Sequence, residues 1–268
     1  MLDTLKRHWP AYLMEAAGLA CFVITAGLLT AALEHPASPL HRAMGDSKVW
    51  RRVPLALAMG GVIAGLVYSP WGRRSGAHIN PAVTWAFFRL GRIAPWDAVF
   101  YTVAQFAGAI GAAYLAAAIV GPPFAHPMVR YGVTVPGPHG PAAAFAGEFA
   151  ISFVLMLALL TAIGSPRLEH HAGWIAGALI AVYLIVEAPL SGMSLNPART
   201  FGSALVSRTW TALWVYFTAP PLAALAAAEA YLHLCRARTG LCGQPGPHYP
   251  VPANDRSGGA GISPKAEP

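Results

Sequence analysis

The chain has 268 residues, of which 56% are hydrophobic and only 11% are charged, and its net charge is +7. Because a soluble domain carries about 25% charged residues, this composition excludes a soluble globular protein and indicates one that crosses a membrane several times. The basic residues lie mostly in short loops beside apolar stretches, so membrane topology explains the positive charge better than a nucleic-acid partner does.

In chain order, six stretches are apolar and long enough to span a bilayer, which requires about 20 residues each. The connection between the third and fourth of them, near Gly121 to Pro141, holds six prolines and is not expected to form a regular helix. Three spans on each side of this connection require the second half to enter the membrane from the opposite side, which makes an inverted repeat. The stretches lie near residues 10–33, 53–70, 94–120, 142–163, 172–190 and 209–233.

We therefore expect a single membrane domain over residues 1–235, with inverted halves at about 10–120 and 142–235. Residues 236–268 are rich in Gly, Pro and Ser and predict a disordered C-terminal tail. The cysteines show no metal-ligand spacing, so we expect no metal or cofactor and interpret them as small apolar fillers rather than a disulfide framework; they are Cys21, Cys235 and Cys242.

The tripeptide Asn-Pro-Ala occurs twice, beginning at Asn80 and at Asn196. Asn is a preferred helix N-cap, Pro is tolerated at the first helical position, and Ala is the strongest helix former, so each copy predicts the start of a helix. The predicted segments, Asn80–Leu90 and Asn196–Ser207, are each about 16–18 Å long, which is roughly half of a 30 Å hydrocarbon core. Two such half-helices that meet tip to tip make one pseudo-span.

The segments leading to the two motifs are non-helical backbone at membrane depth, which is tolerated only inside protein or beside a water-filled cavity. Their carbonyl groups need water or solute as hydrogen-bond partners. We therefore predict a pore and expect the following loop residues to line it: Gly76, Ala77, His78, Gly192 and Ser194.

These motifs resemble the aquaporin, or major intrinsic protein, family. The resemblance covers about residues 10 to 235 and depends on Ser75 to Thr84, on Ser191 to Arg199, and on Tyr101 to Ala109 in the third span. It implies an all-α right-handed bundle of six transmembrane helices with two re-entrant half-helices, usually assembled as a homotetramer with one pore per subunit. The function it implies is passive passage of water across the lipid bilayer.

The resemblance also implies roles for individual side chains. Asn80 and Asn196 donate hydrogen bonds to a solute at the pore centre, where the positive ends of both half-helices repel protons and cations. Arg199 belongs to the narrow outer filter. An Arg inside a membrane is costly and marks function by default.

Counting back from the motifs places Gly60, Leu184 and Met193 in the outer filter beside Arg199. Gly60 stands where water channels usually carry an aromatic residue, and a register shift of one position brings Met59 there instead. This filter is less polar than a strict water filter, so glycerol, ammonia and peroxide are further candidate solutes. Thr200 and Ala204 depart from the pattern of glycerol channels and favour water.

Glu15 and Glu148 each lie in an otherwise apolar span. We interpret them as buried acceptors for backbone N–H groups of the motif loops rather than as a proton relay. His78 is interpreted as a residue of the cytoplasmic pore wall, either a pH-sensitive gate or a packing residue.

Two other functions stay open. One is a glycerol or small-solute facilitator with little preference for water. The other is a coupled secondary transporter, which also uses inverted repeats and broken helices. An enzyme is not expected, because no nucleophile and base are suitably spaced. An N-terminus in the cytoplasm places eleven basic residues inside and six outside, which favours a multi-pass protein of the cell membrane with both termini cytoplasmic.

Overall fold

The computed structural model describes residues 1–237. The disordered tail predicted at 236–268 therefore lies outside the described residues, apart from its first two positions, which end the last helix. Within the described residues the chain forms helices and no strand: α1 (Leu2–Glu34), α2 (Pro39–Met44), α3 (Lys48–Tyr68), α4 (Pro70–Ser75), α5 (Pro81–Arg89), α6 (Pro95–Val120), η1 (Pro122–Ala125), η2 (Arg130–Gly132), α7 (Gly140–Ile163), η3 (Glu169–His171), α8 (Ala172–Val186), α9 (Ala188–Ser191), α10 (Pro197–Ser207) and α11 (Leu213–Ala237).

The long helices follow the predicted spans. By length and composition, five of the described helical segments are able to cross a membrane, namely α1, α3, α6, α7 and α8 with η3. The sixth long helix, α11, contains Pro220, Pro221 and Glu229, which interrupt its apolar run. The connection rich in proline forms only the short helices η1 and η2, as its composition predicts.

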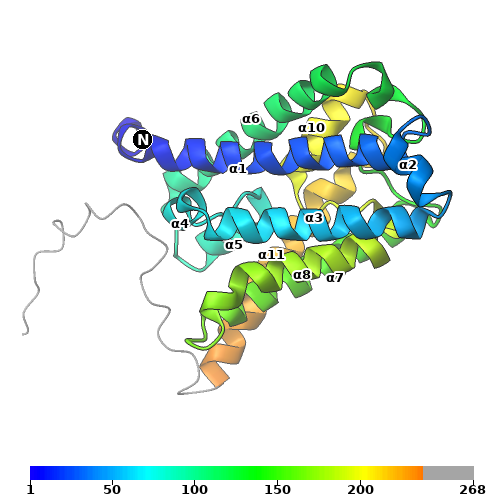
Figure 1. Ribbon diagram of the computed structural model, residues 1–268. Helices are drawn as coiled ribbons and strands as arrows, with labels where there is room; N and C mark the ends of the chain where they lie inside the picture. Colours follow the sequence, from blue (N-terminus) through cyan, green and yellow to red (C-terminus); the bar gives the residue numbers. More distant parts are fainter. Residues whose placement is uncertain (238–268) are drawn as a thin grey trace, which may run out of the picture.

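The two halves of the chain repeat one packing scheme. In each half the first long helix packs on the third, which pairs α1 with α6 and α7 with α11. The second long helices, α3 and α8, pack on each other and join the halves. Figure 1 shows α1 and α3 side by side along most of their length, with α4 near the N-terminus and α2 at the opposite end.

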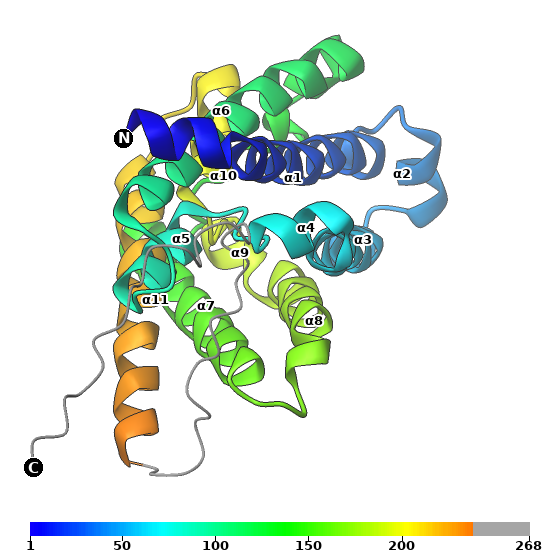
Figure 2. The same ribbon diagram turned by 90° about the vertical axis from the view of Figure 1, so that its left-hand side faces the viewer.

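The two short helices that start at the motifs pack against this frame. Figure 2 views α1 and α3 nearly end-on and shows α9 near the centre of the bundle and α10 beside α6. Each short helix also packs on the last long helix of the other half, α10 on α6 and α5 on α11. The halves are therefore interlocked, and the two motif loops are brought to the centre of the bundle.

Small residues allow these helices to approach closely, as is common between membrane helices. A Cβ added to Gly108 of α6 would lie 2.3 Å from the carbonyl oxygen of Ala16 on α1, and one on Gly202 of α10 would lie 2.6 Å from that of Ala109. Gly111, in contrast, faces no atom within 4 Å.

Cys235 is disulfide-bonded, so interpreting every cysteine as a filler is wrong for this residue.

Candidate functional site

The two loops that precede the motifs have the same unusual backbone. Each begins with a glycine in the left-handed conformation after a short helix, and two non-glycine residues with positive φ follow. Such φ values are uncommon for L-residues and cost free energy, so the surrounding structure must hold them. The φ angles are 92° at Gly76, 48° at Ala77 and 49° at Ile79, and 82° at Gly192, 51° at Met193 and 60° at Leu195.

Glu15 of α1 holds the first loop. Its carboxylate is 1% exposed and accepts hydrogen bonds from the backbone N–H groups of His78 at 3.0 Å and Ile79 at 2.5 Å. The Ser75 hydroxyl donates to it at 2.7 Å and the Gln105 amide at 2.8 Å. The carboxylate thus satisfies two N–H groups that the strained loop leaves without a helical partner.

Glu148 of α7 makes the equivalent contacts in the second half. It is fully buried and accepts from the N–H groups of Ser194 at 2.6 Å and Leu195 at 2.7 Å. The Ser191 hydroxyl donates to it at 2.8 Å. Both carboxylates therefore make the backbone contacts that the sequence analysis expects of them.

Two tyrosines complete these loop anchors, and the sequence analysis assigned them no such role. The Tyr101 hydroxyl donates to the carbonyl of Ser75 at 2.7 Å, and the Tyr216 hydroxyl donates to that of Ser191 at 2.5 Å. The separations along the chain are 26 and 25 residues. This near-equal spacing within the inverted repeat was the available signal.

Asn80 and Asn196 cap the two half-helices and also bind the opposite loop. The Oδ1 of Asn80 accepts from the N–H of Ala82 at 2.9 Å, and that of Asn196 accepts from Ala198 at 3.0 Å. The Nδ2 of Asn80 donates to the carbonyl of Leu195, and the Nδ2 of Asn196 donates to that of Ile79, both at 2.8 Å. Because a side-chain amide has two N–H donors, each asparagine keeps one for another partner.

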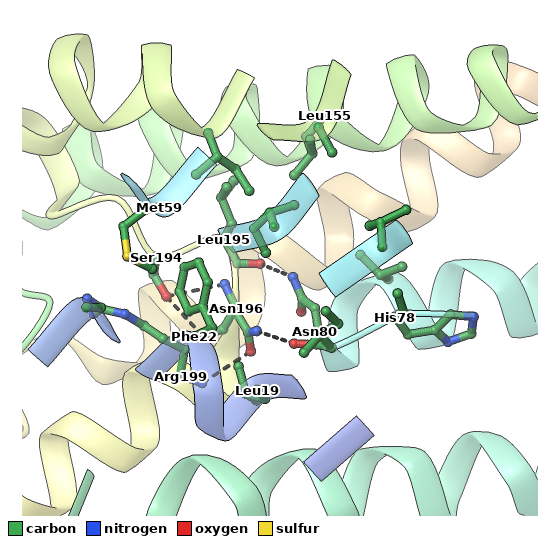
Figure 3. A pocket seen from close by; sticks show the side chains of 18 of the residues that line it. Leu19, Phe22, Met59, His78, Asn80, Leu155, Ser194, Leu195, Asn196 and Arg199 are labelled. Atoms are coloured by element: carbon green, nitrogen blue, oxygen red, sulfur yellow. Dashed lines mark hydrogen bonds between the residues drawn. The ribbon is translucent and has the colours of Figure 1, made fainter. Parts of the chain in front are cut away.

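A cavity of about 140 Å³ lies beside this contact. One water requires roughly 10–15 Å³ measured in the same way, so the cavity has room for several. One wall is an apolar stripe of α3 formed by Leu55, Met59, Ile63 and Val67. This stripe extends over about 18 Å of helix. Figure 3 shows the two asparagines meeting in the cavity, with His78 on one side of them and Met59 and Arg199 on the other.

Most of the predicted site residues line this cavity. From the first half they are Gly76, Ala77, His78 and Asn80, and from the second half Leu184, Met193, Ser194, Asn196 and Arg199.

Gly60 does not line the cavity, so the prediction that it belongs to the filter is wrong. It faces the other side of α3, where an added Cβ would lie 2.4 Å from the carbonyl oxygen of Gly177 on α8. Met59 occupies the cavity wall instead and is 2% exposed. The one-residue register alternative names the residue that lines the cavity, because adjacent helix positions are rotated by about 100°.

Gly192 is the second correction. It is absent from the residues that line the cavity, and its α-carbon faces the connection between the halves. An added Cβ would lie 3.1 Å from the carbonyl oxygen of Val135. Its φ of 82° ends α9 and directs the chain inward, so this glycine serves the turn rather than the wall.

Arg199 follows the second motif and reaches the cavity from the first turn of α10. Among the described residues, its Nη1 is buried and has no hydrogen-bond partner. A buried donor without a partner costs about 1–3 kcal/mol. Arg199 thus keeps one buried donor that no residue of the described chain uses.

His78 is held by its neighbours. Its Nδ1 lies 3.1 Å from the Thr84 hydroxyl, and its ring stacks on Phe87 at a centroid distance of 4.8 Å. Tyr101 contacts it edge-on at 5.2 Å. These contacts fix the imidazole at the cavity wall.

The sequence and the fold were compared with known proteins. The family model described as Major intrinsic protein matches residues 4–231. Aquaporin NIP2-1 of Zea mays is 38% identical over 178 residues, which cover 65% of this chain and 58% of that protein. Aquaporin NIP6-1 of Arabidopsis thaliana is 38% identical over 176 residues, which cover 65% of this chain and 55% of that protein.

Aquaporin NIP1-4 of Oryza sativa subsp. japonica is 39% identical over 179 residues, with 66% of this chain and 63% of that protein covered. The match thus spans less than two thirds of the length of each of these relatives. The fold is similar to that of the aquaglyceroporin from Plasmodium falciparum, with a TM-score of 0.71 and 19% identity, covering 84% of this chain and 95% of that one.

Proposed function

The chain belongs to the major intrinsic protein family, and we propose that it is a passive membrane channel for water and small neutral solutes that excludes protons and ions. The observation that carries this proposal is the reciprocal contact of Asn80 and Asn196 with the opposite loops. It holds two helix N-termini tip to tip beside a cavity that has room for several waters.

The electrostatics of this arrangement support ion exclusion. The N-terminus of a helix carries roughly half a positive charge, and both half-helices direct theirs to the same point. A water that passes there turns its oxygen toward the free amide N–H groups. This orientation interrupts proton transfer along the row of water molecules in the path. The combined positive field of the two helix ends also repels cations.

Arg199 supports the same function at a second point of the path. Its guanidinium stays charged and has a buried donor without a partner among residues 1–237. A neutral solute that brings an oxygen satisfies the donor, whereas a cation meets a like charge. We propose that Arg199, Leu184, Met193 and Met59 form the selective part of the path, with Met59 in place of Gly60.

A solute facilitator with little preference for water is the second candidate. The observation that favours it is the apolar stripe of α3 facing the cavity, with Met59 at its middle. An apolar wall opposite hydrogen-bond donors suits a solute that has a carbon backbone on one side and hydroxyl groups on the other. Glycerol has this character.

Coupled transport has less support. It needs ionisable groups that are free to bind and release a proton or an ion. Glu15 and Glu148 are instead the acceptors that hold the two motif loops. A change in their charge would disturb the loops rather than carry a solute.

The decisive experiment uses the purified protein in lipid vesicles. Stopped-flow light scattering records shrinkage under an impermeant osmolyte for water, and swelling under glycerol for solute. We expect rapid water flow with a low activation energy that an imposed proton gradient leaves unchanged. Water flow no faster than in empty vesicles would contradict the channel, and a dependence on the gradient would favour a coupled transporter.

We further propose that residues 1–235 form one channel domain, that the chain assembles as a homotetramer, and that it lies in the cell membrane with both termini in the cytoplasm. Figure 1 supports one part of this orientation, because α4, which holds Arg73 and Arg74, lies near the N-terminus. Basic residues gather on the cytoplasmic side of membrane proteins. A cysteine placed at Thr4 should resist an impermeant thiol reagent added outside cells, and one at Ala37 should react.

A further inference from the structure

Two methionine side chains line the cavity of the proposed path, and the proposed function does not use the chemistry of their sulfurs. Met59 of α3 and Met193 of the second motif loop both line the cavity. They belong to one buried apolar cluster, in which Met59 is 2% and Met193 5% exposed. Arg199 lines the same cavity as these two side chains.

We propose that Met59 and Met193 form an oxidation site through which peroxide closes the channel. The inference rests on the proposed function, because peroxide reaches these sulfurs by entering the cavity as a small neutral solute. Peroxide oxidises the thioether of methionine to methionine sulfoxide, and methionine sulfoxide reductases reverse this change.

The reaction balances without another reactant. A lone pair of the thioether sulfur attacks one oxygen of hydrogen peroxide, the O–O bond breaks, and a new S–O bond forms. The sulfur loses two electrons, and the second peroxide oxygen accepts them and leaves as water after taking up the remaining proton. The products are one sulfoxide and one water for each peroxide consumed.

The surroundings explain why the product would block the path. Arg199 has a buried Nη1 donor with no partner among the described residues, and Figure 3 places it on the same side of Asn196 as Met59. A sulfoxide oxygen is a strong acceptor, which the thioether is not. It would add an acceptor, extra volume and a fixed dipole to the cavity wall that Met59 and Met193 share with Arg199.

The test measures flow and chemistry on the same vesicles. Reconstituted protein is treated with hydrogen peroxide, and water flow is recorded before treatment, after it, and after addition of methionine sulfoxide reductases of both stereospecificities. Mass spectrometry locates the sulfoxides. We expect a severalfold loss of flow that follows oxidation at residues 59 and 193 and is reversed by the reductases.

Substitution by leucine, which has nearly the volume of methionine, supplies the variants. Met59→Leu with Met193→Leu should keep its flow under peroxide, and each single variant should keep part of it. The matched control is Met128→Leu, because Met128 is 42% exposed and does not line the cavity. Peroxide should reduce water flow through this variant as much as it does for the wild type. If the double variant does not fold, the single variants and the reductase step still show whether oxidation at residues 59 and 193 causes the loss of flow.

Three results would overturn the proposal: sulfoxide at residues 59 and 193 with unchanged flow, closure of the double leucine variant, or oxidation of Met128 alone. Failure of the channel function itself is recognised separately. In that case untreated vesicles show no flow above the lipid background, while the mass analysis still reports whether the cavity methionines were oxidised.

Discussion

Gly60 and Gly177 face each other across α3 and α8, and a Cβ added to either residue would lie 2.4 Å from the carbonyl oxygen of the other. No real Cβ contact is that short, so the two backbones touch only because both residues lack a side chain. This contact joins the two halves of the bundle and determines which face of α3 is turned to the cavity.

We expect Gly60→Ala to destabilise the protein rather than narrow its path. Overpacking a close contact costs about 1–3 kcal/mol, and here the opposing atom is backbone, which cannot rotate away. The measurement is the thermal unfolding midpoint in detergent. Gly61→Ala is the matched control, because nothing lies within 4 Å of its added Cβ, and alanine is the better helix former by about 1 kcal/mol. Equal midpoints for the two variants would contradict the contact.

Met59→Ala is expected to raise glycerol flux severalfold with little change in water flow. The substitution removes a long side chain from the cavity wall, and pore width limits the larger solute first. Stopped-flow swelling in glycerol, compared with shrinkage in an impermeant osmolyte, measures both. Leu57→Ala serves as the control, because Leu57 lies on the same helix but is 64% exposed. A proportional change in the two rates would show that Met59 does not set the width.

Glu148→Gln should weaken the second motif loop. The carboxylate accepts from two backbone N–H groups with its two oxygens, and an amide replaces one of these acceptors with a donor. A buried donor left unsatisfied costs about 1–3 kcal/mol, so the yield of folded protein and its thermal midpoint should fall. The control is Glu229→Gln, which removes a half-exposed ion pair with Arg89 that is worth about 0–1 kcal/mol. Unchanged stability of the Glu148 variant would refute the anchoring role.

Asn196→Asp is expected to slow water flow about tenfold, equivalent to 1.4 kcal/mol, and to admit protons. Aspartate keeps the capping oxygen but has no N–H to donate to the carbonyl of Ile79, and its charge cancels the positive field of the two helix ends. Water flow and a pH-sensitive dye inside the vesicles give the two readings. The inverted repeat predicts a similar result for Asn80→Asp, since that side chain makes the equivalent bond to Leu195. Water flow and proton exclusion equal to those of the wild type would contradict the role of the contact between Asn196 and Ile79.

The sequence alone determined the features that depend on local chemistry. Hydropathy located the long helices. A segment inside an apolar bilayer must pair its own backbone N–H and C=O groups, and therefore folds as a helix. Asn80 and Asn196 located the half-helices because an N-cap and a following proline act within one turn. Glu15 and Glu148 were recognisable as loop supports because a carboxylate in an apolar span requires buried donors.

The tertiary structure decided which atoms meet. Whether residue 59 or residue 60 faces the cavity depends on a rotation of about 100° around α3, and the distant glycine on α8 fixes that rotation by allowing backbone contact on one side only. The bonds of Asn80 to Leu195 and of Asn196 to Ile79 join residues 115 and 117 positions apart, and no local rule pairs them. Motifs and composition specify elements through short-range forces, whereas the width and lining of the path follow from long-range packing, which is defined only when all the helices are in place.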